Sequence, residues 1–370
     1  MKSLFLSAVL LLLVSSSFSQ IMPLTLEPDG GNKKASLSEQ IGIVKIAIEY
    51  NRPGVKGREG KIWNSPVAHY GFADQGHGTS YAAPWRAGAN ENTTFSFSHP
   101  VRIEGKDLPA GKYGFFIALG EQQSTLIFSK VNNSWGSFYY DSTQDALRVK
   151  VTNESLDKSV EWLKYEFTDE TPNSAVVAMS WEKRRIPFKV EADVQALQIA
   201  SFKSELRTTR PFYDFISAAN YCIRNNIELE QALAWMDRAI NFRIMGVKNF
   251  QTLSTKAAVL MKMNRMEEAK KVMEEAIPYG TVQEVHFYAR TLLNQKQTQE
   301  AVKVFKMNYD KFPHVFTTNV GLGRAYSATG DYKKALQYMK AALPLAPDDG
   351  NKTSVAAMIQ KLEEGKDVNQ

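Results

Sequence analysis

Polar and aromatic side chains suited to ligand binding gather in two short segments near the N-terminal end. Arginine forks bind carboxylate and phosphate groups, and an indole ring beside them offers a stacking wall. One interpretation is a ligand pocket in the loop 52–91, formed by Arg52, Lys56, Arg58, Trp85, Arg86, Asn90 and Glu91. The alternative, and the preferred interpretation, is a hydrogen-bonded brace in which Arg86 pairs with Glu91 and Asn90 holds a turn, since buried polar clusters are commonly satisfied internally.

Catalytic chemistry finds little support in the residue spacing. His69, His77 and His99 lie close together in the sequence, but none of them has the spacing of a zinc signature. The chain also has no G-x-S-x-G elbow for a nucleophilic serine. We therefore predict no metal, no cofactor and no enzyme activity. A rival hypothesis is a hydrolase of envelope glycans with its site in the loop 52–91, for which Glu49 and Glu91 are one possible carboxylate pair.

The elements that must position these residues are short strands. Residues 41–50 alternate apolar and polar side chains, which predicts a first strand, and residues 52–89 predict a long loop. Further short segments rich in β-branched and aromatic residues follow: 94–98, 101–103, 113–119, 125–130, 137–140, 147–151, 160–168, 175–181 and 186–190. Short strands at this spacing are typical of a β-sandwich or an open barrel.

A different period begins near Glu191, where apolar residues take helical spacing. Alanines recur at 232, 269, 301 and 335, so the intervals are 37, 32 and 34 residues. This resembles the tetratricopeptide repeat (TPR), a helical hairpin of about 34 residues that buries its apolar face only by stacking on neighbours. The last unit carries the most complete motif: Leu322, Gly323, Tyr326, Gly330, Ala335, Met339, Ala342 and Pro347. Met358 and Ile359 are expected on a capping helix.

The β region has motifs of its own. They are the segments 50–58, 85–94 and 108–113, then Trp135-Gly136, 147–149, Glu161-Trp162 and Trp181-Glu182. In that order they resemble the bacterial domain of unknown function 2911, although the link between Trp63 and Trp85 differs, with a Gly/Ser/His-rich stretch. The resemblance implies exported bacterial proteins that often carry TPR units behind the domain, with no settled activity.

The N-terminus has the features of a secretion signal. Lys2 precedes an apolar run over 4–14 that is too short to span a bilayer, and Ser17 and Ser19 supply small residues for cleavage. We therefore expect export to the periplasm or secretion, with Gln20 as the first mature residue. No later stretch is apolar enough to predict a transmembrane segment. Cys222 is the one cysteine, so no internal disulfide can form.

Charge gives no indication of nucleic-acid binding. The chain of 370 residues has a net charge of +6 and a pI of about 9.0. From Val194 onward the chain has 24 Lys and Arg residues and 18 Asp and Glu residues, and it contains no run of four or more basic residues. Such spread charge is typical of solvated helix faces. We predict no nucleic-acid partner.

The sequence thus predicts a mainly β N-terminal domain followed by an all-α TPR solenoid. The expected segments are a signal peptide at 1–19, a flexible leader at 20–40, the β domain at 41–190, a linker helix at 191–209, and TPR repeats with the capping helix at 210–370. The expected function is that of an exported, non-enzymatic binding or scaffold protein. Its TPR groove would take a protein or peptide partner, and its β domain an unknown ligand.

Overall fold

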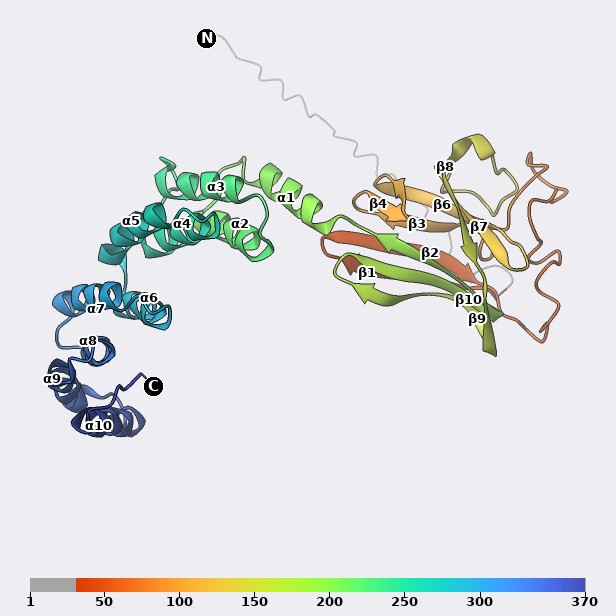
Figure 1. Ribbon diagram of the computed structural model, residues 1–370. Helices are drawn as coiled ribbons and strands as arrows, with labels where there is room; N and C mark the ends of the chain where they lie inside the picture. Colours follow the sequence, from red (N-terminus) through yellow and green to blue (C-terminus); the bar gives the residue numbers. More distant parts are fainter. Residues whose placement is uncertain (1–30, 370) are drawn as a thin grey trace, which may run out of the picture. The chain divides into compact units, whose positions relative to one another are not determined.

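The computed structural model describes residues 31–369. The chain divides into two compact units, of which the first ends at Ile199 and the second begins at Ala200 (Figure 1). The predicted signal peptide and most of the predicted leader lie outside the described residues. Each unit is considered by itself. Within the described part of the chain, no helix is both long and apolar enough to cross a membrane.

The first unit contains a six-stranded antiparallel sheet. Its strands, in order across the sheet, are β1 (Lys33–Ile41), β2 (Val44–Arg52), β3 (Thr93–Phe97), β6 (Gly111–Ala118), β7 (Gln123–Ser129) and β8 (Asp145–Thr152). In β2 the buried Val44, Ile46, Ile48 and Tyr50 share one face, as period-two alternation requires. The predicted first strand therefore has the expected inward face.

A second, four-stranded sheet is dominated by one long hairpin. Its strands, in order, are β5 (Lys106–Leu108), β4 (Val101–Ile103), β10 (Ser174–Glu191) and β9 (Glu154–Thr171). The strands predicted at 160–168, 175–181 and 186–190 were too short. The apolar pattern is confined to parts of the hairpin, whereas pairing runs from Arg185 opposite Glu154 to Ser174 opposite Thr171, with bulges between. Backbone pairing extends the strands past their apolar residues.

Two further expectations were wrong. Residues 33–40 were assigned to a flexible leader, but they belong to β1, whose residues pair with β2 from Lys33 to Ile41. The outer face of β1 is polar, so the sequence of this segment resembles that of a loop. Backbone pairing with β2 nevertheless makes it a strand. Residues 137–140 were assigned to a strand but form a turn, in which the Tyr140 amide donates to the Ser137 carbonyl at 3.1 Å.

The core of the first unit lies where aromatic side chains of the two sheets meet. Phe95 and Phe115 of the larger sheet lie 5.7 and 5.9 Å, between ring centroids, from Phe188 of β10. All three rings are buried, as is Trp181 of β10. Aromatic side chains each bury a large apolar area, so this cluster is a main source of stability for the unit.

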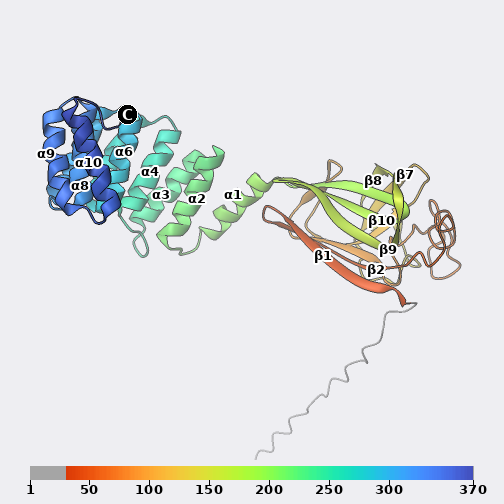
Figure 2. The same ribbon diagram turned by 90° about the horizontal axis from the view of Figure 1, so that it is seen from below.

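Helical hairpins make up the second unit (Figure 2). The helices are α1 (Val194–Glu205), α2 (Phe212–Asn225), α3 (Leu229–Asn241), α4 (Phe250–Lys262), α5 (Met266–Ala276), α6 (Val282–Asn294), α7 (Thr298–Lys311), α8 (Phe316–Ala328), α9 (Tyr332–Ala342) and α10 (Asp349–Glu363). Four hairpins, α2–α3 to α8–α9, are therefore followed by α10, which buries Val355, Met358 and Leu362.

The predicted repeat register matches the packing. Ala232, Ala269, Ala301 and Ala335 are each at most 2% exposed. A larger side chain at these positions would separate the helices, so small residues there allow the close approach typical of the hairpin. Gly330 joins α8 to α9 with φ of +80°, a conformation that glycine adopts without steric cost.

Candidate functional site

The loop between β2 and β3 is fixed to both sheets at a few points. The Trp85 amide donates to the Ile117 carbonyl at 3.0 Å, and the Ile117 amide donates back at 2.9 Å. Near the start of the loop, the Val55 amide donates to the Glu161 carbonyl at 2.8 Å. Tyr70 lies beside Leu119 through an isolated bridge. A long loop is thereby held in place without regular secondary structure.

Tryptophans form the floor beneath the loop. The Trp63 ring contacts Trp85 and Trp181 edge-on, at centroid distances of 6.1 and 5.7 Å, and Trp85 stacks on Trp181 at 6.1 Å. The Glu182 carboxylate accepts a hydrogen bond from Trp63 Nε1 at 2.9 Å. The Arg184 guanidinium lies 4.5 Å from the Trp63 ring centroid. Glu182 and Arg184 were not predicted as supports of the loop, because both lie far along the chain in β10.

A pocket of about 270 Å³ has one of these tryptophans, Trp85, in its lining. Of the predicted ligand-binding residues, it brings together Arg58, Trp85, Arg86 and Asn90. The remaining lining residues are Asn32, Pro53, Pro66, Val67, His69, Gln75, Gly88, Ala89 and Ser137. Among residues 31–369, no Asp or Glu lines this pocket. Burial lowers the pKa of His69 below its ordinary value, so its ring is neutral at pH 7.

Arg86 is one of the two arginines that line this pocket. Its Nη1 donates to the Asn90 carbonyl at 3.0 Å, and its guanidinium lies 4.9 Å from the Phe138 ring centroid. Burial lowers the pKa of this guanidinium, because the cation has lost part of its hydration. The proposed pairing of Arg86 with Glu91 does not occur, since the chain turns between them at Asn90, whose φ is +56°.

The other predicted residues do not line this pocket. The Arg52 Nε donates to the Leu163 carbonyl at 2.8 Å, and the Lys56 amide donates to Glu161 Oε1 at 3.1 Å. Glu91 lines a neighbouring pocket of about 450 Å³ and accepts a hydrogen bond from Asn51 Nδ2 at 2.7 Å. Arg52, Lys56 and Glu91 are therefore absent from the lining of the Arg86 pocket.

The possible catalytic pair, Glu49 and Glu91, lines that neighbouring pocket together. Glu49 forms an ion pair with Lys112 at 2.7 Å, and the hydrogen bond from Lys112 lowers the pKa of this carboxyl. The side chains of Glu49 and Glu91 are 56% and 50% exposed. A glycosidase acid needs a raised pKa, which burial away from cations provides. Glu49 is placed in the opposite environment.

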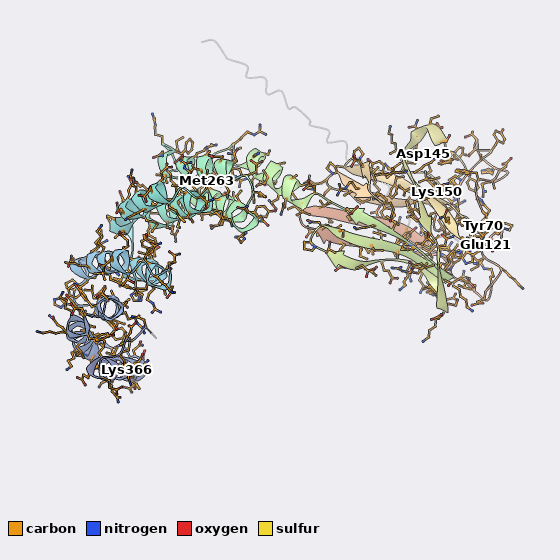
Figure 3. All side chains as sticks on the ribbon, in the orientation of Figure 1. Tyr70, Glu121, Asp145, Lys150, Met263 and Lys366 are labelled. Carbon is orange, nitrogen blue, oxygen red and sulfur yellow. The ribbon has the colours of Figure 1, made fainter. Side chains whose placement is uncertain are left out.

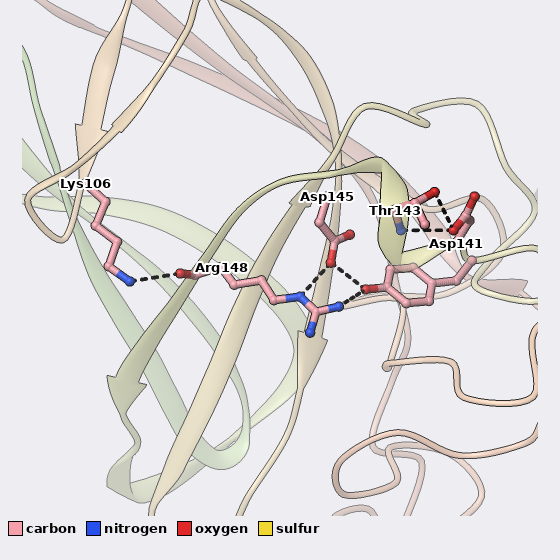
Figure 4. A network of polar contacts seen from close by, with 6 residues as sticks. Lys106, Asp141, Thr143, Asp145 and Arg148 are labelled. Carbon is pink, nitrogen blue, oxygen red and sulfur yellow. Dashed lines mark hydrogen bonds and ion pairs between the residues drawn. The ribbon is translucent and has the colours of Figure 1, made fainter.

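A polar network that the sequence analysis missed lies at β8 (Figure 4). The Tyr140 hydroxyl donates to Asp145 Oδ2 at 2.7 Å, Arg148 Nε donates to the same oxygen at 2.6 Å, and Arg148 Nη2 donates to the hydroxyl at 2.8 Å. Figure 3 labels Asp145 and Lys150 on this strand. Burial of the Tyr140 hydroxyl raises its pKa, and the hydrogen bond with Asp145 raises it further. All three bonds involve Asp145 Oδ2 or the Tyr140 hydroxyl, whereas Asp145 Oδ1 is buried without a hydrogen-bond partner among residues 31–369. The network links Tyr140 of the turn to Asp145 and Arg148 of β8.

The three histidines that lie close together in the sequence, His69, His77 and His99, do not share one site. Only His69 lines the Arg86 pocket, while His77 packs against Phe138 and His99 bonds with Ser98. Over residues 31–369 no group of three or more His, Cys, Asp or Glu side chains is arranged to hold a metal ion.

In the helical unit, a groove of about 780 Å³ opens between the second and third hairpins. The first hairpin packs on the second through α3 and α4, and the third on the fourth through α7 and α8. At the junction between these pairs, the short 3-10 helix η3 (Ile277–Tyr279) leads from α5 to α6. The groove lies at this junction, lined mainly by α5 and α6 with residues of α4 and α7.

The groove is apolar inside and acidic in net charge. Met261, Met266 and Phe287 line it and remain 38%, 59% and 67% exposed. Its charged lining residues are Glu267, Lys270, Glu274, Glu284 and Glu300, one lysine against four glutamates. Exposed apolar side chains gathered in one concave place mark an interaction site.

Comparison with known proteins supports both units separately. A family model described as "Protein of unknown function (DUF2911)" matches residues 32–190, and tetratricopeptide repeat models match residues 250–277 and 292–361. No curated protein matches the chain.

Among solved structures, the chain is similar to YrrB, titled "a TPR protein with an unusual peptide-binding site". The identity is 19%, the match covers 41% of this chain and 77% of that chain, and the TM-score is 0.28. The chain is also similar to MamA from Desulfovibrio magneticus RS-1. The identity is 17%, the match covers 41% of this chain and 93% of that chain, and the TM-score is 0.27. The family matches confirm the resemblance and its order along the chain. The N-terminal unit is a domain of the family of proteins of unknown function DUF2911, and the helices behind it are tetratricopeptide repeats.

Proposed function

We propose that this chain is an exported, non-enzymatic scaffold whose helical repeats bind a segment of a partner protein. The observation that carries the proposal is the open apolar groove between the second and third hairpins. Its exposed methionines adapt their shape to a partner, and Phe287 offers an aromatic anchor. Repeat arrays commonly bind partners through such surfaces.

Charge indicates the kind of segment that fits. The glutamates outnumber the single Lys270, whose ammonium is already paired with Glu300 at 2.7 Å. The acidic groove contrasts with the helical region as a whole, which has more basic than acidic residues. Complementary charge favours the right partner and suppresses wrong ones. The occupant we propose is a short amphipathic segment with apolar and basic side chains.

The rival hydrolase hypothesis has weaker support. Of residues 31–369, those that line the Arg86 pocket are arginines, a histidine, a serine, polar amides and aromatic or apolar residues, with no Asp or Glu. The pocket that does contain Glu49 and Glu91 holds them exposed, with Glu49 paired to Lys112. Glycoside hydrolysis requires one carboxyl that stays protonated near neutral pH. This composition favours ligand binding over hydrolysis.

Replacement of Phe287 tests the groove. In the mature chain, Phe287→Ala is expected to weaken binding of an amphipathic, lysine-bearing peptide at least about tenfold, because aromatic anchors at the centre of an interface contribute most of its affinity. Fluorescence anisotropy with a labelled peptide measures the effect. A peptide with the same apolar residues and glutamates in place of lysines should bind more weakly to the wild type.

Tyr213→Ala is the matched control, because Tyr213 is 59% exposed on α2 and does not line the groove. It should leave the affinity unchanged. Equal loss in both variants, or equal binding of the two peptides, would contradict the proposal. Self-association that Phe287→Ala abolishes would show that a second copy of the chain is the occupant.

We also propose export, on the strength of the apolar run over 4–14 with its preceding Lys2. Expressed in a bacterial host, the chain should be recovered outside the cytoplasm, and N-terminal sequencing should begin at Gln20 or within a few residues of it. Placing an arginine pair in the apolar run should block this processing. An intact Met1 on protein from the extracytoplasmic fraction would refute the signal peptide.

A further inference from the structure

We propose that the pocket between Arg58 and Arg86 binds the carboxylate of a small organic anion. This site lies in the first unit and is independent of the helical groove. Its charged lining residues are both arginines, and no carboxylate lines it within residues 31–369. Two cations that share a partly enclosed space without an acidic partner favour the entry of an anion.

Arg86 uses one of its three guanidinium nitrogens for a hydrogen bond within residues 31–369. Only Nη1 has an acceptor, the Asn90 carbonyl at 3.0 Å. Nε and Nη2 form no hydrogen bond or ion pair with any residue in the range 31–369. These two nitrogens form the fork that matches the two oxygens of a carboxylate. By contrast, Arg148 and Arg185 in the same unit are paired with Asp145 and Glu154.

Contacts behind Arg86 hold this fork in one orientation. Phe138 lies under the guanidinium, at 4.9 Å between Cζ and the ring centroid. Gly136 approaches so closely that a Cβ at this position would lie 2.2 Å from Arg86 Cζ. Gly136 also has φ of +65°, which favours glycine. A side chain fixed before binding loses little entropy when a ligand arrives, which is a property of binding sites.

The second cation is fixed in a similar way. Arg58 donates from Nε to the Val55 carbonyl at 3.0 Å and from Nη2 to the Gly54 carbonyl at 2.7 Å. Its positive charge is therefore oriented by neutral carbonyl groups, and no Asp or Glu of residues 31–369 forms an ion pair with it. The two arginines come from opposite ends of the loop, so the folded loop, not local sequence, assembles the site.

The remaining lining residues define the rest of the ligand. Trp85, Pro53 and Val67 contribute an apolar wall. A volume of about 270 Å³ admits a small molecule. A carboxylate attached to a flat or apolar group matches both parts of the lining, whereas inorganic phosphate would leave the apolar wall unused. Such a group belongs either to a free organic acid or to the C-terminus of a peptide.

The test compares benzoate with benzamide, which has the same shape without the charge. In calorimetric titrations of the mature chain, benzoate should bind at least about tenfold more tightly than benzamide. Inorganic phosphate should bind more weakly than benzoate. A short peptide with a free C-terminal carboxylate, measured beside the same peptide with a C-terminal amide, identifies the source of the carboxylate. If the free peptide binds more tightly than both its amide and benzoate, the ligand is a peptide terminus. If benzoate binds more tightly than the free peptide, the ligand is a free acid.

Variants connect binding to the two arginines. Arg86→Gln and Arg58→Gln should each weaken benzoate binding at least about tenfold, whereas Arg185→Gln, outside the pocket, should not change it. Circular dichroism establishes whether each variant is folded. If Arg86→Gln does not fold, the affinity of Arg58→Gln alone tests the proposal. The proposal fails if benzamide or phosphate binds as tightly as benzoate, or if both pocket variants bind like the wild type. It also fails if Arg86→Gln lowers the melting temperature while the wild type binds no carboxylate, since Arg86 would then be a brace.

Discussion

Trp181→Ala is expected to destabilise the first unit by about 3–5 kcal/mol, the usual cost of truncating a large buried aromatic side chain. Trp181 is fully buried and packs against Trp63 and Trp85. Its Nε1 has no hydrogen-bond partner within residues 31–369, so the loss comes from packing and burial alone. Hydrogen exchange of the mature chain, followed in β3, β6 and β10, measures the change in opening free energy.

The control for this prediction is Trp135→Ala, because Trp135 is 46% exposed. Its effect should stay near about 0.5 kcal/mol. Trp85 would also lose the ring on which it stacks, so the pocket beside Arg86 should become less ordered in the Trp181→Ala variant. Similar losses in the two variants would show that the tryptophan floor does not support the unit.

Ala335→Trp is expected to destabilise the last hairpin by about 1–3 kcal/mol or more, because a large ring cannot enter a packed helix contact without strain. Ala335 is fully buried on α9. Across the hairpin, a Cβ at Gly323 would already lie 2.8 Å from Met339 Cε. The space between α8 and α9 therefore has no room for a larger side chain. Hydrogen exchange in these two helices measures the effect separately from the first unit.

Ala341→Trp provides a matched comparison, since it introduces the same side chain at an exposed alanine of the same helix. Its effect should be within about 0.5 kcal/mol of zero. Equal destabilisation by the two substitutions would contradict the repeat register. Faster exchange in α8 and α9 for Ala335→Trp alone would support it.

Local periodicity explains which parts of the fold could be predicted. Each TPR hairpin is formed by contacts between residues close in sequence, so the recurring alanines revealed both the period and the buried positions. The inward face of β2 followed from alternation in the same way. The β9 strand was predicted too short because its two ends carry few apolar residues, and β10 was predicted as two strands because the charged residues 182–185 interrupt its apolar pattern. Backbone pairing does not depend on side-chain type.

The candidate site illustrates the opposite case. Arg86 and Glu91 are five positions apart, and their types suggested a pair. The left-handed conformation at Asn90 turns the chain between them, so Glu91 bonds with Asn51 and Arg86 packs on Phe138. In an irregular loop, side-chain direction depends on such single dihedral angles and on distant partners. Neither leaves a periodic signal in the sequence.

By itself, the sequence determined the β-then-TPR order, the repeat register and the residue types available for binding. These depend on local propensity and on periodic burial, which neighbouring residues encode. Only the tertiary structure decided that β1 pairs with β2, that Arg58 and Arg86 line one pocket, and that a groove opens between the second and third helical hairpins. Those features require residues far apart in sequence to meet, and the geometry of their meeting is set by packing of the whole unit.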